Sequence, residues 1–148
     1  MTMDESYQDK FMEQALTQAK IAYKKGEIPI GAVIVKDGKV IAKGYNLREK
    51  SKCAILHAEI LAIKKACKRV KNWRLEGCDI FVTVEPCLMC MGAILNARID
   101  NLYYGAKNES MKNVNIDYNK SILNHKLNVF GNIKASECSA LLKSFFKR

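Results

Sequence analysis

Two short stretches of the sequence carry residue types that bind metal ions and move protons. The first is His57-Ala58-Glu59, and the second, which begins 29 residues after His57, is Pro86-Cys87-Leu88-Met89-Cys90. Proline is suited to the first turn of a helix, and Cys87 and Cys90, three positions apart, share one helix face. Two thiolates and a neutral imidazole are good zinc ligands, and three protein ligands with one open position are typical of a catalytic zinc site.

Glu59 is the candidate proton carrier of this site. Zinc with two thiolates has no net charge and is a milder Lewis acid than zinc with three histidines, so another group must take the proton from its water molecule. Positions two apart on a regular helix do not face each other. We therefore expect His57 in the first turn of its helix or just before it, with Glu59 reaching into the same cavity.

Each motif alone has a less specific explanation. A single histidine is more often a core or surface residue, and a Cys-x-x-Cys pair also occurs in redox proteins. A zinc ribbon needs a second Cys-x-x-Cys pair, which the sequence lacks. The combination of both motifs, each opening a helix and separated by one strand, predicts a catalytic zinc site.

Hydrophobic periodicity predicts the elements that position these motifs. The segment 46–52 reads as a loop, and 106–126 is polar and irregular, with a short helix near 118–123. The turn Asp37-Gly38 is a strong hairpin signal. Strands are expected at 30–35, 39–45, 79–84, 102–105 and 127–130, and helices at 4–25, 57–70, 86–97 and 135–147.

This order of elements predicts an α/β fold with three layers, α/β/α, around a five-stranded mixed sheet, because alternating strands and helices place helices on both faces. The 21 residues of 106–126 are long enough for a further crossover. Such a crossover would make the last strand parallel to its predecessor, but periodicity alone leaves the direction of this strand open. The length of 148 residues predicts a single domain over 1–148.

The overall charge and the cysteines narrow the class of protein. The net charge of +10 suits either a nucleic-acid partner or a basic surface kept for solubility. Residues 1–10 have no apolar stretch, and the longest apolar run, 28–35, has only eight residues. We therefore expect no signal peptide, no membrane segment and a cytoplasmic location. Cysteines in a reducing compartment indicate metal binding or catalysis, and those outside the motif are expected to be core or incidental residues: Cys53, Cys67, Cys78 and Cys138.

Taken together, the motifs resemble the cytidine deaminase superfamily and, within it, the bacterial tRNA adenosine deaminases. The resemblance covers nearly the whole chain and extends to a cytidine deaminase-like fold. The segments that carry it are Glu27 to Val33, Gly44-Tyr45-Asn46, His57 to Ile60, Thr83 to Cys90 with Gly92-Ala93, Tyr104-Gly105-Ala106, Asn124-His125, Glu137-Cys138, Leu141-Leu142 and Phe145 to Arg148.

The resemblance implies hydrolytic deamination of a tRNA wobble adenosine to inosine by a zinc-bound hydroxide, with one Zn²⁺ per chain. It implies that His57, Cys87 and Cys90 hold zinc and that Glu59 shuttles protons. The implied partners are a tRNA anticodon stem-loop and a second subunit of a homodimer. The implied substrate contacts are Ile30, which packs on the base, Asn46, which contacts the flipped-out nucleoside, Asn124, which contacts the anticodon loop, and Ala58, Pro86, Phe145 and Phe146.

The sequence departs from the family at 52–56, where the family often has an Asp-Pro-Thr-like run, and at 107–113, which contains no glycine although the family usually has a Gly-rich loop there. Both loops would lie near the substrate.

Two alternative functions stay open: a zinc deaminase of a free base or nucleoside of the guanine or cytosine type, and a non-catalytic zinc-stabilised RNA-binding module. Phe145 and Phe146 are adjacent, so at most one faces the core squarely, and the other is available for base stacking or for a partner subunit.

Overall fold

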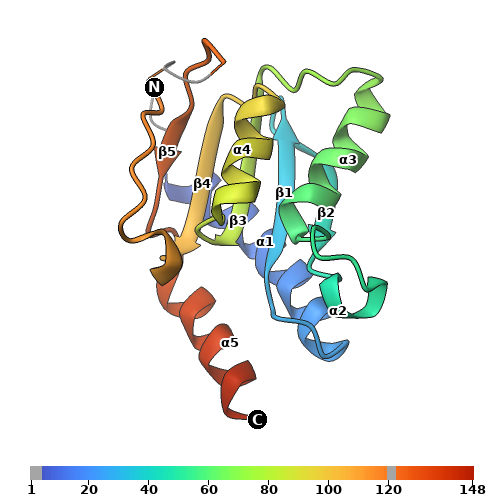
Figure 1. The fold of residues 1–148 in the computed structure, drawn as a ribbon, viewed down its shortest axis with the longest axis vertical. Helices are drawn as coiled ribbons and strands as arrows, with labels where there is room; N and C mark the ends of the chain where they lie inside the picture. Colours follow the sequence, from blue (N-terminus) through green and yellow to red (C-terminus); the bar gives the residue numbers. More distant parts are fainter. Residues whose placement is uncertain (1–4, 120–122) are drawn as a thin grey trace.

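The computed structural model describes residues 5–119 and 123–148. In this part of the chain five strands form one sheet in the order β2-β1-β3-β4-β5, with helices on both faces (Figure 1). The strands are β1 (Gly31–Lys36), β2 (Lys39–Tyr45), β3 (Cys78–Val84), β4 (Asn101–Ala106) and β5 (Asn128–Phe130). The helices are α1 (Glu5–Lys24), α2 (Arg48–Ser51), α3 (Ala58–Val70), α4 (Leu88–Asn96) and α5 (Ala135–Lys147), and a 3-10 helix spans Glu109–Met111.

The strand directions make the sheet mixed, as predicted. β1 is antiparallel to both β2 and β3, whereas β3–β4 and β4–β5 are parallel pairs. The segment between β4 and β5 is therefore a crossover, which decides the orientation of the last strand. The β1–β2 turn has positive φ at both Asp37 and Gly38, the backbone that a tight two-residue hairpin requires.

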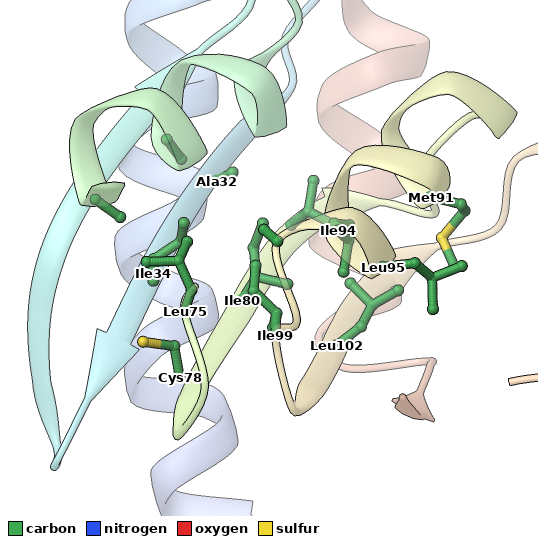
Figure 2. Close-up of a cluster of buried hydrophobic side chains, with 14 of the residues drawn as sticks. Ala32, Ile34, Leu75, Cys78, Ile80, Met91, Ile94, Leu95, Ile99 and Leu102 are labelled. Atoms are coloured by element: carbon green, nitrogen blue, oxygen red, sulfur yellow. The ribbon is translucent and has the colours of Figure 1, made fainter. Parts of the chain in front are cut away.

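Two apolar layers fix the helices against the sheet. On one face α3 and α4 cover β1, β3 and β4, and Figure 2 shows Met91, Ile94 and Leu95 of α4 above Ile80 and Leu102. On the other face α1 packs with α5 over the opposite side of the same strands. The three-layer α/β/α fold is therefore confirmed. No helix among the described residues has the length and apolar character needed to cross a membrane.

Two short elements differ from the sequence prediction. The expected loop 46–52 contains the helix α2. The expected short helix near 118–123 is wrong for its described part, because Asn119 forms an isolated antiparallel bridge with Lys126; residues 120–122 lie outside the described residues. A 3-10 helix forms earlier in this segment, at Glu109–Met111, where the side chain of Asn108 accepts a hydrogen bond from the Ser110 N–H.

Two glycines allow helices to lie directly on the sheet. A Cβ atom at Gly31 of β1 would collide with the backbone of α1 at Ala15 and Ala19, and a Cβ at Gly44 of β2 would collide with α3 at Ala58. Both contacts are with backbone atoms, which cannot rotate away as a side chain can. The distance between each helix and its strand therefore depends on these glycines.

Replacing Gly31 with alanine should lower the free energy of unfolding by about 3 kcal/mol, because α1 must move away from β1. Gly92→Ala is the matched control, since a Cβ at this α4 position meets nothing within 4 Å. The control should be neutral or stabilising by up to about 1 kcal/mol. Urea denaturation of both variants measures the difference, and equal stabilities would contradict the close approach.

Candidate metal centre

Two of the predicted ligands sit at helix N-termini. His57 is the N-cap residue of α3, with φ −77° and ψ 160°, and Cys87 is the N-cap residue of α4, with φ −69° and ψ 172°. An N-cap side chain usually accepts a hydrogen bond from its own helix, but neither of these does so. Pro86 precedes the cap, so α4 begins two residues later than predicted. The extended backbone at each N-cap directs the side chain away from its own helix.

The ligand atoms of His57, Cys87 and Cys90 form one cluster. The Nδ1 atom of His57 lies 3.6 Å from the Sγ atom of Cys87 and 3.6 Å from that of Cys90, and all three atoms lie within 4.8 Å of one another. A tetrahedral zinc with bonds of about 2.0 Å to nitrogen and 2.3 Å to sulfur places these atoms about 3.5 Å apart. The geometry therefore fits a zinc ion held by one nitrogen and two sulfurs.

The two cysteines of the cluster differ in their pKa values. The pKa of Cys87 is lowered to about 5, mainly by a hydrogen bond from Cys90 and against the effect of burial, with His57 lowering it further. The same hydrogen bond, with burial and the nearby Glu59, raises the pKa of Cys90. Cys87 is therefore a thiolate at neutral pH, which is the form of cysteine that binds metals.

Glu59 is buried beside this cluster. It is the second residue of α3 and is only 3% exposed. Burial raises its pKa to about 7, and its carboxyl group is hydrogen-bonded to Cys90. His57 and Glu59 reach the same cavity because His57 lies just before the helix in extended backbone, the arrangement that the two-residue spacing requires.

A pocket of about 80 Å³ opens next to Glu59. Asn46, which is buried, lies in its wall: its side chain accepts a hydrogen bond from the Arg48 N–H at 3.2 Å and donates one to the Ile28 carbonyl at 3.4 Å. The pocket therefore brings predicted substrate contacts together with a predicted ligand and the predicted proton carrier. Its lining is Ile28, Ile30, Asn46, Arg48, His57, Ala58 and Glu59.

The other predicted substrate contacts lie outside this pocket. Pro86 is buried directly before Cys87, and Asn124 is exposed with φ 50°. On α5, Phe145 packs edge-on against Tyr23 with ring centroids 5.5 Å apart, whereas Phe146 is 67% exposed. Neither phenylalanine is fully buried, and the more exposed Phe146 is the one available for a partner.

The four remaining cysteines do not join the metal cluster. Cys78 and Cys138 are buried, as expected for core residues, and Cys53 and Cys67 are partly exposed. All of them have free thiols. Burial raises the pKa of Cys78 to about 11 and that of Cys138 to about 12, so these thiols stay protonated at neutral pH.

The atypical loop after β4 is attached to the residue before Pro86. The backbone N–H of Asn108 donates to the Glu85 carboxylate at 3.1 Å, and the Asn108 side chain donates to the Glu85 carbonyl at 3.3 Å. A second, larger pocket of about 340 Å³ lies between this loop and Tyr104. The loop that departs from the family pattern therefore borders the segment that carries Cys87.

Sequence reasoning missed one buried residue that holds the pocket wall. Glu27 is fully buried, and its two carboxylate oxygens accept hydrogen bonds from the backbone N–H groups of Glu49 at 3.0 Å and Lys50 at 2.7 Å. These are unpaired N–H groups of the first turn of α2. Glu27 thereby ties the segment before β1 to the segment that carries Asn46. The sequence shows only that Glu27 is a carboxylate next to an apolar strand. This position does not reveal which N–H groups the carboxylate binds.

Glu27→Gln should destabilise the protein by about 2–3 kcal/mol, because one oxygen is replaced by an NH₂ group that faces an N–H donor. Glu49→Gln is the matched control, since that side chain is 73% exposed and forms only a surface pair with Arg48. The control should change stability by less than about 0.5 kcal/mol. Thermal unfolding of both variants tests this, and similar losses would contradict the assigned role of Glu27.

Comparison with known proteins agrees with the site. A family model for the cytidine and deoxycytidylate deaminase zinc-binding region matches residues 5–106. The fold and the His-Cys-Cys cluster are those of a zinc-dependent deaminase, and the chain belongs to the cytidine and deoxycytidylate deaminase family. The match includes every predicted zinc ligand.

The more specific resemblance is confirmed by individual relatives. The tRNA-specific adenosine deaminase of Streptococcus pyogenes serotype M1 is 44% identical over 144 residues, which cover 95% of this chain and 84% of that protein. A solved structure from a study of A-to-I editing by tRNA:A34 deaminases is 38% identical, with a TM-score of 0.78 over 90% of this chain and 99% of that one. A guanine deaminase structure from Bacillus subtilis is 40% identical, with a TM-score of 0.65 over 73% of this chain and 69% of that one.

Proposed function

We propose that this chain hydrolyses the wobble adenosine of a tRNA anticodon loop to inosine. The observation that carries the proposal is the buried carboxyl group of Glu59 beside the His57-Cys87-Cys90 cluster, at the wall of a pocket. A structural zinc site has no need for a carboxyl group that is not a ligand, so Glu59 favours an enzyme over a zinc-stabilised binding module. The tRNA-specific relatives and the net charge of +10 support an RNA substrate.

In the proposed reaction the oxygen of water bonds to C6 of adenine, the C6–N6 bond breaks, and ammonia leaves. His57, Cys87 and Cys90 would hold the zinc ion, which would supply Lewis-acid chemistry that makes water nucleophilic near neutral pH. Glu59 takes a proton from the attacking water and passes protons to the purine ring and to the leaving amino group. Its pKa of about 7 suits this role, because a general acid–base group works best near the operating pH.

The pocket lining supports the substrate contacts nearest the reaction. Ile30 would pack on the base and Asn46 would contact the nucleoside, because both line the pocket that contains Glu59. The hydrogen bonds of Asn46 to Ile28 and Arg48 hold its side chain in place. Ala58 would complete the wall next to His57 and Glu59, and Pro86 would contact the substrate from its position directly before Cys87.

The contacts with the rest of the anticodon stem-loop would come from Asn124, Phe145 and Phe146, of which Asn124 and Phe146 are exposed.

We also propose a homodimer. Leu88 and Met89, which lie between the two cysteines, are 60% and 37% exposed, and apolar residues at that position suit a second subunit. Sedimentation velocity should show twice the monomer mass, and a monomer at micromolar concentration would contradict the dimer. A tRNA substrate fits the expected cytoplasmic location.

Purified protein should contain about one zinc ion per chain, and Cys87→Ala should lose most of it because one of three protein ligands is gone. Cys53→Ala is the matched control and should keep its zinc, since Cys53 lies outside the cluster. Elemental analysis measures both variants. Full zinc content in Cys87→Ala would show that the ligand set is wrong.

Glu59→Gln should keep zinc and lose activity by about 10⁴-fold or more. General acid–base groups typically supply about 10²–10⁴-fold, and Glu59 is assigned several proton transfers. Single-turnover kinetics with saturating RNA, together with zinc analysis, separate this role from metal binding. Loss of zinc in this variant would instead make Glu59 a ligand.

The main competing function is deamination of a free base or nucleoside, which the similarity to the Bacillus subtilis guanine deaminase keeps open. The deciding experiment incubates the zinc-loaded protein with a tRNA anticodon stem-loop containing adenosine at the wobble position, and separately with guanine, cytosine and their nucleosides. Mass spectrometry should show adenosine converted to inosine in the RNA and slow or no reaction of the small substrates. Rapid deamination of guanine with untouched RNA would overturn the proposal.

A further inference from the structure

The solvent-facing side of α3 carries a concentrated positive charge away from the pocket. We call Lys64, Lys65, Lys68, Arg69 and Lys71 the α3 basic face, and all five side chains are exposed. The same stretch, 64–71, contains no aspartate or glutamate. Within the described residues none of the five forms an ion pair, so the charge of the face is not balanced within the chain.

This arrangement disfavours the helix that carries it. Lys64 and Lys68 are four residues apart, as are Lys65 and Arg69, and like charges at this spacing repel each other on a helix. Arg69 extends towards the edge strand β2, where its guanidinium donates a hydrogen bond to the Ile41 carbonyl at 3.4 Å. A helix in which every charged position of two turns is cationic is well suited to an external polyanion.

The positive surface continues beyond the end of α3 to an exposed aromatic ring. Trp73 is 54% exposed, and the guanidinium groups of Arg74 and Arg98 lie 4.6 Å and 5.4 Å from its ring centroid. Arg74 also pairs with Glu76 at 3.5 Å, so the charge here is partly offset. Arginine beside an exposed aromatic ring is a composition that suits nucleic acid.

The position of this face relative to the pocket suggests which part of an RNA it meets. α3 begins at the metal centre and leads away from it (Figure 1). At a rise of about 1.5 Å per residue, Lys64 lies about 10 Å and Lys71 about 20 Å along the helix from His57. A base-paired stem that extends from the pocket along α3 would therefore lie within reach of the α3 basic face.

We propose that the α3 basic face binds the phosphates of the RNA stem next to the loop that enters the pocket. The proposal rests on the proposed function, because that function supplies the RNA substrate. The contacts would be to the backbone of the duplex, as in other sequence-independent recognition of double-stranded RNA. The face would strengthen binding of the stem-loop without touching the reacting base.

The test compares two triple variants with equal net charge. Lys64→Gln/Lys65→Gln/Lys68→Gln removes three charges from the α3 basic face, and Lys10→Gln/Lys20→Gln/Lys24→Gln removes three exposed charges from α1, on the other face of the sheet. Glutamine is a good helix former, so both should fold. Thermal unfolding and zinc content, unchanged from the parent protein, confirm this.

The measurement is the affinity for an anticodon stem-loop RNA as a function of salt concentration. Each phosphate contact contributes about 0.7–0.9 to the slope of log K against log salt. The α3 variant should therefore show a slope smaller by about 2–3, whereas the α1 variant keeps the parental slope. Equal slopes for the two variants would overturn the proposal, whether both fall, as a general charge effect predicts, or neither does.

Deamination at saturating RNA separates this proposal from the proposed function. The α3 variant should keep the parental maximal rate and show a higher RNA concentration at half-maximal rate, because the three lysines are exposed to solvent whereas Glu59 is buried beside the metal cluster. A parental protein that binds the stem-loop with the expected slope but never deaminates it would reject the proposed function alone. An α3 variant with a lower maximal rate and an unchanged slope would reject the α3 contact alone.

Discussion

The metal centre depends on the convergence of two helix N-termini at one end of the sheet. β3 lies between α3 and α4 in the chain, and His57 and Cys87 occupy the N-cap positions of these helices. The positive dipole ends of the two helices therefore meet at one place. The side chains of both N-cap residues lie there too, because neither caps its own helix. The placement of the helices thus brings His57 close to both cysteines and allows the Cys87–Cys90 contact that lowers the pKa of Cys87.

The placement of the helices depends in turn on close backbone contacts and on a buried carboxyl group. Gly44 allows α3 to lie on β2, so the residue that follows β2, Asn46, ends up beside Glu59. Glu27 then holds the segment after Asn46 through the backbone of α2. One wall of the pocket is therefore fixed by helix packing and the other by hydrogen bonds across 22 residues of sequence.

The sequence predicted what local patterns determine. Apolar periodicity predicted the sheet and its long helices within one or two residues, and the His-x-Glu and Pro-Cys-x-x-Cys motifs predicted the cluster. The helix α2 was not predicted, because its N–H groups are satisfied by Glu27, a contact that no local pattern reveals. The start of α4 was also misplaced: Pro86 suggested a first turn, but Cys87 is the cap. The roles of Asn124, Phe145 and Phe146 stay predictions, since they depend on an RNA that the chain alone does not define.

The proposed chemistry requires that one nitrogen and two sulfurs of this chain hold a zinc ion and leave one position open. X-ray absorption spectroscopy of the zinc-loaded protein measures these ligands. We expect two sulfur neighbours at about 2.3 Å and two lighter neighbours, nitrogen or oxygen, at about 2.0–2.1 Å. The lighter pair comprises the His57 nitrogen and an exchangeable fourth ligand. Four sulfur neighbours, or none, would contradict the assignment of His57, Cys87 and Cys90.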